Sequence, residues 1–163
     1  MRTLSLTTTR REEFLDITAE VAAILKDMVR EAVLPAGLSG WLSEGTGLVY
    51  SPHTTAAVTI NEGADPDVRR DMLAHLAHLV PLEGGPNGGV VAGFRHAEGN
   101  SDAHIKTSLM GPSQLVPVAG GRLQLGTWQK IYFCEFDGPR RRSVLVQFLP
   151  AAITTTVEAG EGE

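Results

Sequence analysis

From about Ile105 onward, the sequence is a succession of short apolar segments separated by turn residues, and this order constrains the fold more than any other feature. The segments alternate in polarity or are rich in valine, isoleucine and aromatic residues, which is typical of β-strands. Asp137-Gly138 predicts a hairpin, with a loop longer than two residues because Pro139 follows. The expected strands are 105–109, 114–118, 121–125, 127–136 and 141–149.

The first eighty residues carry two helical patterns. Apolar side chains recur at the i, i+3, i+4, i+7 spacing between 18 and 32, and again between Pro66 and Val80. Asp65 predicts the start of the second helix, because its carboxylate can cap the helix and proline suits the first helical position. Helices early and strands late predict an α+β fold, with two main helices packed on one face of antiparallel β-sheets. Further strands are expected at 13–17, 47–52 and 56–61.

The bulk properties of the chain limit its class. A length of 163 residues fits a single domain spanning 1–163, with a tail that frays from about residue 151. The net charge of −5 argues against nucleic-acid binding, which depends on many Lys and Arg contacts to phosphates. The N-terminus lacks a secretory signal, and no stretch approaches the ~20 apolar residues of a membrane span. We therefore expect a cytoplasmic protein without a nucleic-acid or membrane partner.

The arginines are clustered rather than spread. The clusters are Arg10-Arg11, Arg69-Arg70 and Arg140-Arg141-Arg142. Because guanidinium groups bind phosphate and carboxylate through paired N–H groups, such clusters indicate capture of a small anion. The last cluster follows Glu135, which alternates with apolar residues of its strand. Glu135 is therefore expected either to form a fork-like ion pair with one of these arginines or to contact a substrate phosphate. The single cysteine, Cys134, is expected to be buried and inert.

The nine residues 96–104 contain two histidines, two carboxylates, an asparagine and a serine. Fully extended, they would hold the two imidazoles about 25 Å apart. Gly99 breaks the extension, so that both rings can face one point. Neutral imidazole is a common ligand of zinc, and carboxylates complete or orient such sites. The segment predicts a metal site, with a polar surface loop as the alternative.

A third histidine, His53, precedes the strand expected at 56–61. On a regular strand His53 and Asn61 share a face but stand about 26 Å apart. They can contact one small ligand only if the strand bends or a neighbouring subunit contributes; otherwise they serve different ends of a site. The junction after Asn61 could hold an anion at the helix N-terminus, although capping alone explains Asp65.

Four segments together resemble the YjbQ family, which is associated with secondary thiamine-phosphate synthase activity. The resemblance covers roughly residues 14–148 and implies a compact α+β fold, a homotrimer, and a site containing histidines near a subunit boundary. It also implies that hydroxymethylpyrimidine diphosphate is joined to a thiazole phosphate, with release of pyrophosphate stabilised by a cation and arginines. The segments are SPHTTAAVTINE at 51–62, DPDVRRD at 65–71, GNSDAH at 99–104 and GTWQKI at 126–131.

The resemblance and the patterns above give three sets of candidate residues. The candidates for holding a divalent metal, zinc or magnesium, are His53, His96 and His104. The candidates for catalysis are the carboxylates Glu62, Asp71, Glu98 and Asp102. The candidates for substrate binding are Asn61, Asn100, Ser101, Trp128, Gln129, Glu135, Arg140 and Arg141.

Two alternatives to the transferase reaction remain open at this point. Three histidine ligands leave a coordination position for a water acidified toward a pKa of about 7, which predicts metal-dependent hydrolysis of a phosphorylated or ester metabolite. The other alternative is a non-catalytic trimer that binds a small anion.

Overall fold

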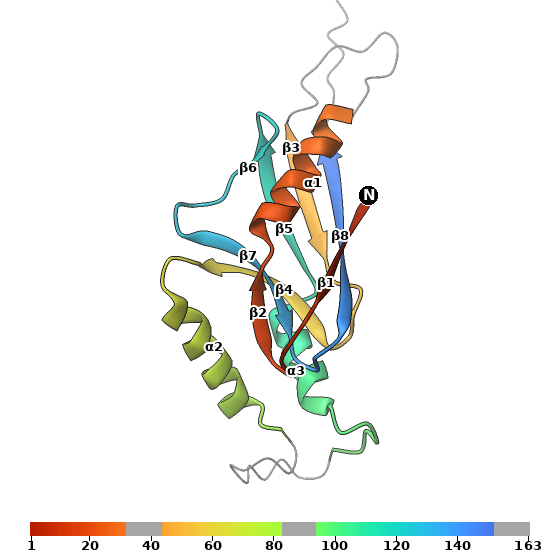
Figure 1. Cartoon of the computed structure of the whole chain (residues 1–163), viewed down its shortest axis with the longest axis vertical. Coiled ribbons are helices and arrows are strands. Elements are labelled where there is room, and N and C mark those ends of the chain that lie inside the picture. Colours follow the sequence, from red (N-terminus) through yellow and green to blue (C-terminus); the bar gives the residue numbers. More distant parts are fainter. Residues whose placement is uncertain (32–43, 83–93, 152–163) are drawn as a thin grey trace, which may run out of the picture.

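The computed structural model describes residues 1–31, 44–82 and 94–151, and the tail expected to fray lies outside these ranges. Within them, eleven elements form two antiparallel sheets and three helices (Figure 1). The helices are α1 (Thr18–Glu31), α2 (Pro66–Leu79) and α3 (Ser101–Met110). The strands are β1 (Arg2–Thr7), β2 (Glu13–Asp16), β3 (Gly45–Tyr50), β4 (Ala56–Glu62), β5 (Ser113–Ala119), β6 (Arg122–Leu123), β7 (Gln129–Glu135) and β8 (Arg141–Pro150).

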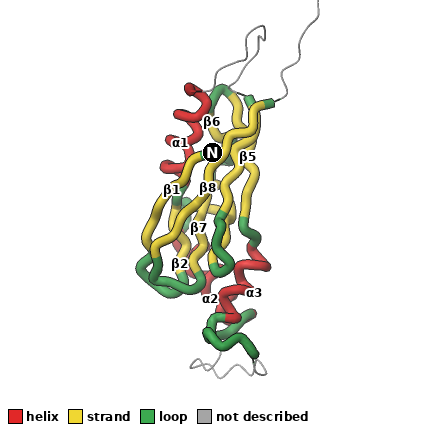
Figure 2. The backbone as a smooth tube through the Cα atoms, turned by 90° about the vertical axis from the view of Figure 1, so that its right-hand side faces the viewer, coloured by secondary structure: helices red, strands yellow, loops and turns green. Residues whose placement is uncertain are grey.

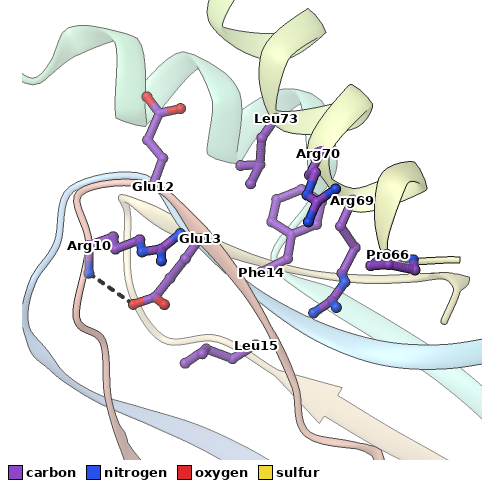
Figure 3. Close-up of a pocket in the computed structure, with 9 residues that line it drawn as sticks. All are labelled: Arg10, Glu12, Glu13, Phe14, Leu15, Pro66, Arg69, Arg70 and Leu73. Carbon is purple, nitrogen blue, oxygen red and sulfur yellow. Dashed lines mark hydrogen bonds between the residues drawn. The ribbon is translucent and has the colours of Figure 1, made fainter.

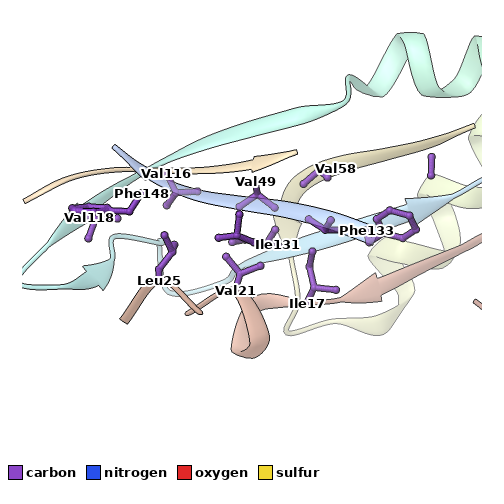
Figure 4. Packing of buried hydrophobic residues seen from close by; sticks show 13 residues of the cluster. Ile17, Val21, Leu25, Val49, Val58, Val116, Val118, Ile131, Phe133 and Phe148 are labelled. Carbon is purple, nitrogen blue, oxygen red and sulfur yellow. The ribbon is translucent and has the colours of Figure 1, made fainter. Parts of the chain in front are cut away.

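The strands divide into a five-stranded sheet with the order β1-β8-β3-β5-β6 and a three-stranded sheet with the order β2-β7-β4. All pairings are antiparallel. The two sheets share one apolar core, in which Val49 and Val116 of the larger sheet belong to the same cluster as Val58, Ile131 and Phe133 of the smaller one (Figure 4). The predicted α+β class with antiparallel sheets is therefore confirmed.

The central strand of the smaller sheet, β7, is covered on both faces. Ile131 and Phe133 point into the core between the sheets, whereas Tyr132 and Cys134 belong to a second cluster that packs under α2. This explains the nearly continuous apolar run of β7, since a strand buried on both faces loses the alternation of polarity. Burial raises the pKa of the Cys134 thiol, in agreement with the predicted inert cysteine.

The helices occupy three different places. α1 inserts Val21 and Leu25 into the core between the sheets, and α2 covers the outer face of the three-stranded sheet. α3 lies at the opposite end of the strands from α1 (Figures 1 and 2). The two early helices were expected on one face; they pack on different surfaces because each sheet leaves a different apolar surface open. The Asp65 carboxylate caps α2 as predicted, accepting from Asp67 N at 2.8 Å. None of the described helices is long and apolar enough to cross a membrane.

The strand predicted at 105–109 is wrong, because these residues form the second half of α3. The buried face of this helix consists of Asp102, Ala103, Lys106 and Thr107, so it lacks the apolar period by which a helix is recognised. The sequence contains two weaker signals of a helix at these residues. An Asp and a Lys stand at the i, i+4 spacing of a helical ion pair, and Gly111, with φ of 88°, ends the helix before a proline.

The hairpin predicted at Asp137-Gly138 is also wrong, because β7 and β8 belong to different sheets. The connection crosses from one sheet to the other beside the β1–β2 loop. Gly138 N donates to Arg11 O at 2.9 Å, and a Cβ on Gly138 would stand 2.3 Å from Arg10 O. Turn residues that usually mark a hairpin thus serve here for a close approach between two loops.

Candidate functional site

Four segments meet at the α3 end of the molecule: the β1–β2, β3–β4 and β7–β8 connections, and α3 itself (Figure 1). The strand register produces this meeting, because the first residue of β4, Ala56, pairs with the last residue of β7, Glu135, which also pairs with the first residue of β2, Glu13. Residues far apart in the sequence are therefore brought to one end of the smaller sheet.

The three candidate histidines gather at this end. His53 and His104 line one hollow of about 360 Å³, together with hydroxyl-bearing residues such as Thr107 and Ser108. His104 and His96 line a neighbouring hollow of about 380 Å³, and their ring centroids stand 5.3 Å apart in an edge-to-face arrangement. The three imidazoles thus lie at one end of a single chain, but His53 and His96 line different hollows and only His104 lines both. Within the described residues, however, no three His, Cys, Asp or Glu side chains stand close enough to hold a metal ion by themselves.

His53 is held in a defined tautomer. Its Nε2 accepts a hydrogen bond from Ser143 N at 2.9 Å, so the proton of the neutral ring resides on Nδ1. Burial lowers the pKa of His53, and the nearby Arg142 guanidinium lowers it further. In this position the Nδ1–H of His53 is able to donate a hydrogen bond, and ligation of a metal through Nε2 would require the ring to leave Ser143.

We expect this tautomer and pKa to be measurable in metal-free protein. In a ¹⁵N–¹H spectrum at pH 7, Nε2 of His53 should be unprotonated and its titration midpoint should lie below the ordinary histidine value of about 6.5. Because the folded protein binds this proton less readily than the unfolded chain, the contribution of His53 to stability is present above that value and is lost as the pH falls below it. A midpoint at or above 6.5 would contradict the assignment.

The buried ion pair of Glu135 and Arg142 lies beside His53. Arg142 donates from Nε to Glu135 Oε2 at 2.7 Å and from its terminal nitrogen to Glu135 Oε1 at 2.6 Å. Thr8 Oγ1 donates to the same carboxylate at 3.1 Å, and Arg142 also donates to Thr55 Oγ1 at 2.8 Å. The predicted fork-like pair is confirmed, with Arg142 as the partner. Glu135 is fully buried, and its carboxylate is occupied by these groups.

A second ionic network joins α3 to the β1–β2 connection. Lys106, which is fully buried, donates to Glu12 at 2.6 Å and to Asp102 at 3.1 Å. Arg11 donates to Asp102 at 2.9 Å and to Asp137 at 3.3 Å. Asp102, a catalytic candidate, is therefore buried between two cations. Sequence reasoning missed Lys106, and it expected the Arg10-Arg11 cluster to capture an anion, because the pairs Lys106–Glu12 and Arg11–Asp102 join segments far apart in the sequence.

Asp137 links this network to the β7–β8 connection. Burial acts to raise its pKa, but hydrogen bonds from Asn100 and Arg140 and the charges of Arg140 and Arg11 outweigh it and hold the pKa below its usual range. Asn100 Nδ2 donates to Asp137 at 3.0 Å, while Asn100 Oδ1 is buried without a partner among the described residues. Arg140, predicted to bind substrate, donates to Asp137 at 2.7 Å.

The remaining candidates at this end are more exposed. Glu98 stands 3.8 Å from His96 Nε2 with most of its side chain in solvent. Ser101 begins α3 and lines the hollow of His96 and His104. Arg141 is exposed at the start of β8, where it pairs with Thr7.

The other five candidates lie away from the histidines. Glu62 pairs with Gln129 at the end of β4 opposite to Ala56, and six strand steps separate these ends by roughly 20 Å. Gln129 Oε1 accepts from Gly126 N at 2.8 Å, and Trp128 is 64% exposed. Within a single chain, these five residues do not line the histidine hollows. They are Asn61, Glu62, Asp71, Trp128 and Gln129.

Comparison with known proteins finds relatives that all belong to one family. The family model described as "UPF0047 protein YjbQ-like" matches residues 2–151. The UPF0047 protein YugU of Bacillus subtilis is 46% identical over 149 residues, covering 91% of this chain and 98% of that protein. A UPF0047 protein of Methanocaldococcus jannaschii is 42% identical, covering 87% of this chain and 88% of that protein.

Solved structures agree with these relatives. A YjbQ/UPF0047 protein from Clostridium acetobutylicum superposes with a TM-score of 0.74 at 45% identity, covering 91% of this chain and 100% of that one. A conserved hypothetical protein from Thermus thermophilus gives a TM-score of 0.74 at 38% identity with the same coverage. The chain belongs to the UPF0047 (YjbQ-like) family.

Proposed function

We propose that this protein is a metal-assisted enzyme acting on a small phosphorylated metabolite, with its site in the histidine-lined hollows at the α3 end. The observation that carries the proposal is the gathering of His53, His96 and His104 around two adjoining hollows. Hollows of this size fit small metabolites. Donors that could bind a phosphate are present, namely the Nδ1–H of His53 and the hydroxyls of Thr54 and Thr107.

A divalent ion fits the pair His96–His104 best. Both side chains reach the same hollow, and imidazole nitrogen is a common ligand of zinc. Two ligands from one chain leave coordination positions for substrate or for a neighbouring subunit. When bound, such an ion would supply positive charge beside a phosphate. His53, with its proton on Nδ1, would donate a hydrogen bond to the same phosphate.

The finer proposal is a transferase reaction of the thiamine-phosphate synthase type, in which pyrophosphate departs. Hydrolysis of a phosphorylated or ester metabolite is the second candidate, and one observation favours it. No arginine lines either histidine hollow in the described part of the chain, and Arg140 is bound to Asp137, so the guanidinium expected to stabilise a departing pyrophosphate is not in position.

We propose that the assembly is a homotrimer. The outer face of the five-stranded sheet supports this, because no described helix covers it and it presents exposed apolar side chains, among them Tyr50, Leu115 and Leu149. His53 lies at the rim of this face through its hydrogen bond to Ser143. A neighbouring subunit packed there could supply a carboxylate, since Asp102 and Glu135 are buried in ion pairs.

The first test is zinc binding to chelator-treated protein, measured by titration calorimetry. We expect His104→Ala to weaken binding at least about tenfold, because it removes a ligand common to both hollows. His78→Ala is the matched control, since His78 lies on α2 beside His75. A loss of binding in the control with retention in His104→Ala would place the metal on α2 and contradict the proposal.

The second test is turnover on a panel containing hydroxymethylpyrimidine diphosphate with thiazole phosphate, and phosphate and carboxylate esters. Release of pyrophosphate identifies the transferase, and release of phosphate or alcohol from single substrates identifies the hydrolase. His53→Ala should abolish whichever reaction is found. Equal inactivity of the wild type and His53→Ala on the whole panel would leave the non-catalytic anion-binding protein as the better account.

A further inference from the structure

A separate hollow lies between β2 and the first half of α2, and it has a different chemistry from the two histidine hollows (Figure 3). Its volume is about 350 Å³, and none of its lining residues lines either histidine hollow. We call it the arginine hollow, after Arg10 of the β1–β2 connection and Arg69 and Arg70 of α2. Two of the three arginine clusters in the sequence thus converge on one place, which the proposed function does not use.

The carboxylates of the arginine hollow are already engaged. Glu12 accepts from the buried Lys106 at 2.6 Å, and Glu13 accepts from the backbone N–H groups of Thr9 and Arg10. Arg70 is paired with Asp67. In contrast, neither the Arg10 nor the Arg69 guanidinium has a carboxylate within salt-bridge distance in the described ranges. Two guanidinium groups without a salt-bridge partner therefore line the hollow beside the Glu13 carboxylate, and together they favour an anionic ligand.

The position of Arg69 is defined by its packing. Its guanidinium carbon lies 5.6 Å from the centre of the Tyr132 ring, and Tyr132 OH donates to Glu62 O at 3.1 Å. A guanidinium resting on an aromatic face keeps its N–H groups free along its edge. Arg69 is thus held ready to bind an oxyanion.

The wall of the hollow is apolar. Phe14, Leu15, Pro66 and Leu73 line it beside the arginines (Figure 3). Phe14 is only 6% exposed, so its ring is held rigidly by the cluster beneath α2. A ligand that combines charge with an apolar body would bury that body against this wall.

β2 adds a backbone donor at the same place. It is an edge strand, and Ile17 N donates to Ile131 O, so the odd-numbered residues form the hydrogen-bonded pairs with β7. The N–H of Phe14 therefore faces the free edge of β2, where it can donate to an anion.

We propose that the arginine hollow is a binding site for a small organic phosphate, with the phosphate between Arg10 and Arg69 and the apolar or aromatic body against Phe14 and Leu73. A phosphomonoester carries a charge of about −1.5 to −2 at neutral pH, and its several oxygens can accept hydrogen bonds from both guanidinium groups. This site is separate from the histidine hollows and goes beyond the proposed function.

The test uses phenyl phosphate as the probe in a ¹⁵N–¹H titration of the full chain. We expect saturable shifts at Phe14, Arg69 and Leu73. Arg10→Gln and Arg69→Gln should each weaken binding at least about tenfold, because each removes a charge-assisted contact. Arg122→Gln is the matched control, since this exposed arginine lies on β6, outside the hollow. His53→Ala should bind the probe at this site as the wild type does, which separates this proposal from the proposed function.

Two comparison ligands complete the test. Inorganic phosphate should bind more weakly than phenyl phosphate because it lacks the apolar body, and neutral benzyl alcohol should not saturate. The proposal is overturned if shifts are confined to residues around His104, if Arg69→Gln and Arg122→Gln behave alike, or if benzyl alcohol or inorganic phosphate binds as well as the probe.

Discussion

Replacing Arg142 with methionine is expected to destabilise the protein by about 3–5 kcal/mol, because it leaves the fully buried Glu135 carboxylate without its cation. Methionine retains most of the stem, so the loss reports the charge and its hydrogen bonds rather than a cavity. Two bonds to Glu135 and one to Thr55 disappear together. Chemical denaturation at neutral pH measures the free energy of unfolding.

The neighbouring Arg141→Met is the control, since Arg141 is exposed and should change stability by less than about 0.5 kcal/mol. The double variant Glu135→Leu with Arg142→Met should recover much of the loss, because an apolar pair of similar volume replaces the ion pair. If Arg142→Met and Arg141→Met cost the same, the Glu135–Arg142 pair does not stabilise the core as argued.

Lys106→Met is expected to destabilise the protein by about 3 kcal/mol and to loosen α3 selectively. Lys106 is the cation between Glu12 and Asp102, and its removal leaves Asp102 with Arg11 alone. Since α3 carries His104, zinc binding should weaken together with the helix. Hydrogen exchange should show α3 opening before the strands of the core.

Lys26→Met on the exposed side of α1 is the control for this variant and should leave both stability and exchange in α3 unchanged. Uniform acceleration of exchange over the whole molecule, with no preference for α3, would mean that the Lys106 network supports the global fold rather than the position of His104.

The sequence predicted those elements whose burial is apolar. The apolar stripe of α1 and the apolar and β-branched residues of β3, β4 and β8 supply the shared core, and these patterns are visible without any structure. The arginine that pairs with Glu135 could also have been identified from the sequence. Val144, Val146 and Phe148 are the buried residues of β8, so this alternation places Arg142, and not Arg141, on the core side.

The elements and ion pairs that the sequence did not predict depend largely on contacts between distant segments. α3 buries Asp102 and Lys106 only because Arg11 and Glu12 from the β1–β2 connection neutralise them, and no local pattern contains this information. β1 was also not predicted, although Leu4 and Leu6 alternate with polar residues in the period of a strand and pack on the core. The assignment of β7 and β8 to different sheets likewise follows from the partners of each strand, whereas the turn residues between them suggested a hairpin.

The position of β8 has a consequence for the order in which the molecule can fold during synthesis. β8 lies between β1 and β3, and Arg2 of β1 pairs with Val146 of β8. β1 therefore cannot pair until nearly the whole described chain has been synthesised. The three-stranded sheet is complete once β7 has been translated, whereas the larger sheet cannot close until β8 emerges. We expect a nascent chain truncated after Glu135 to retain exposed strand edges and to need chaperone protection.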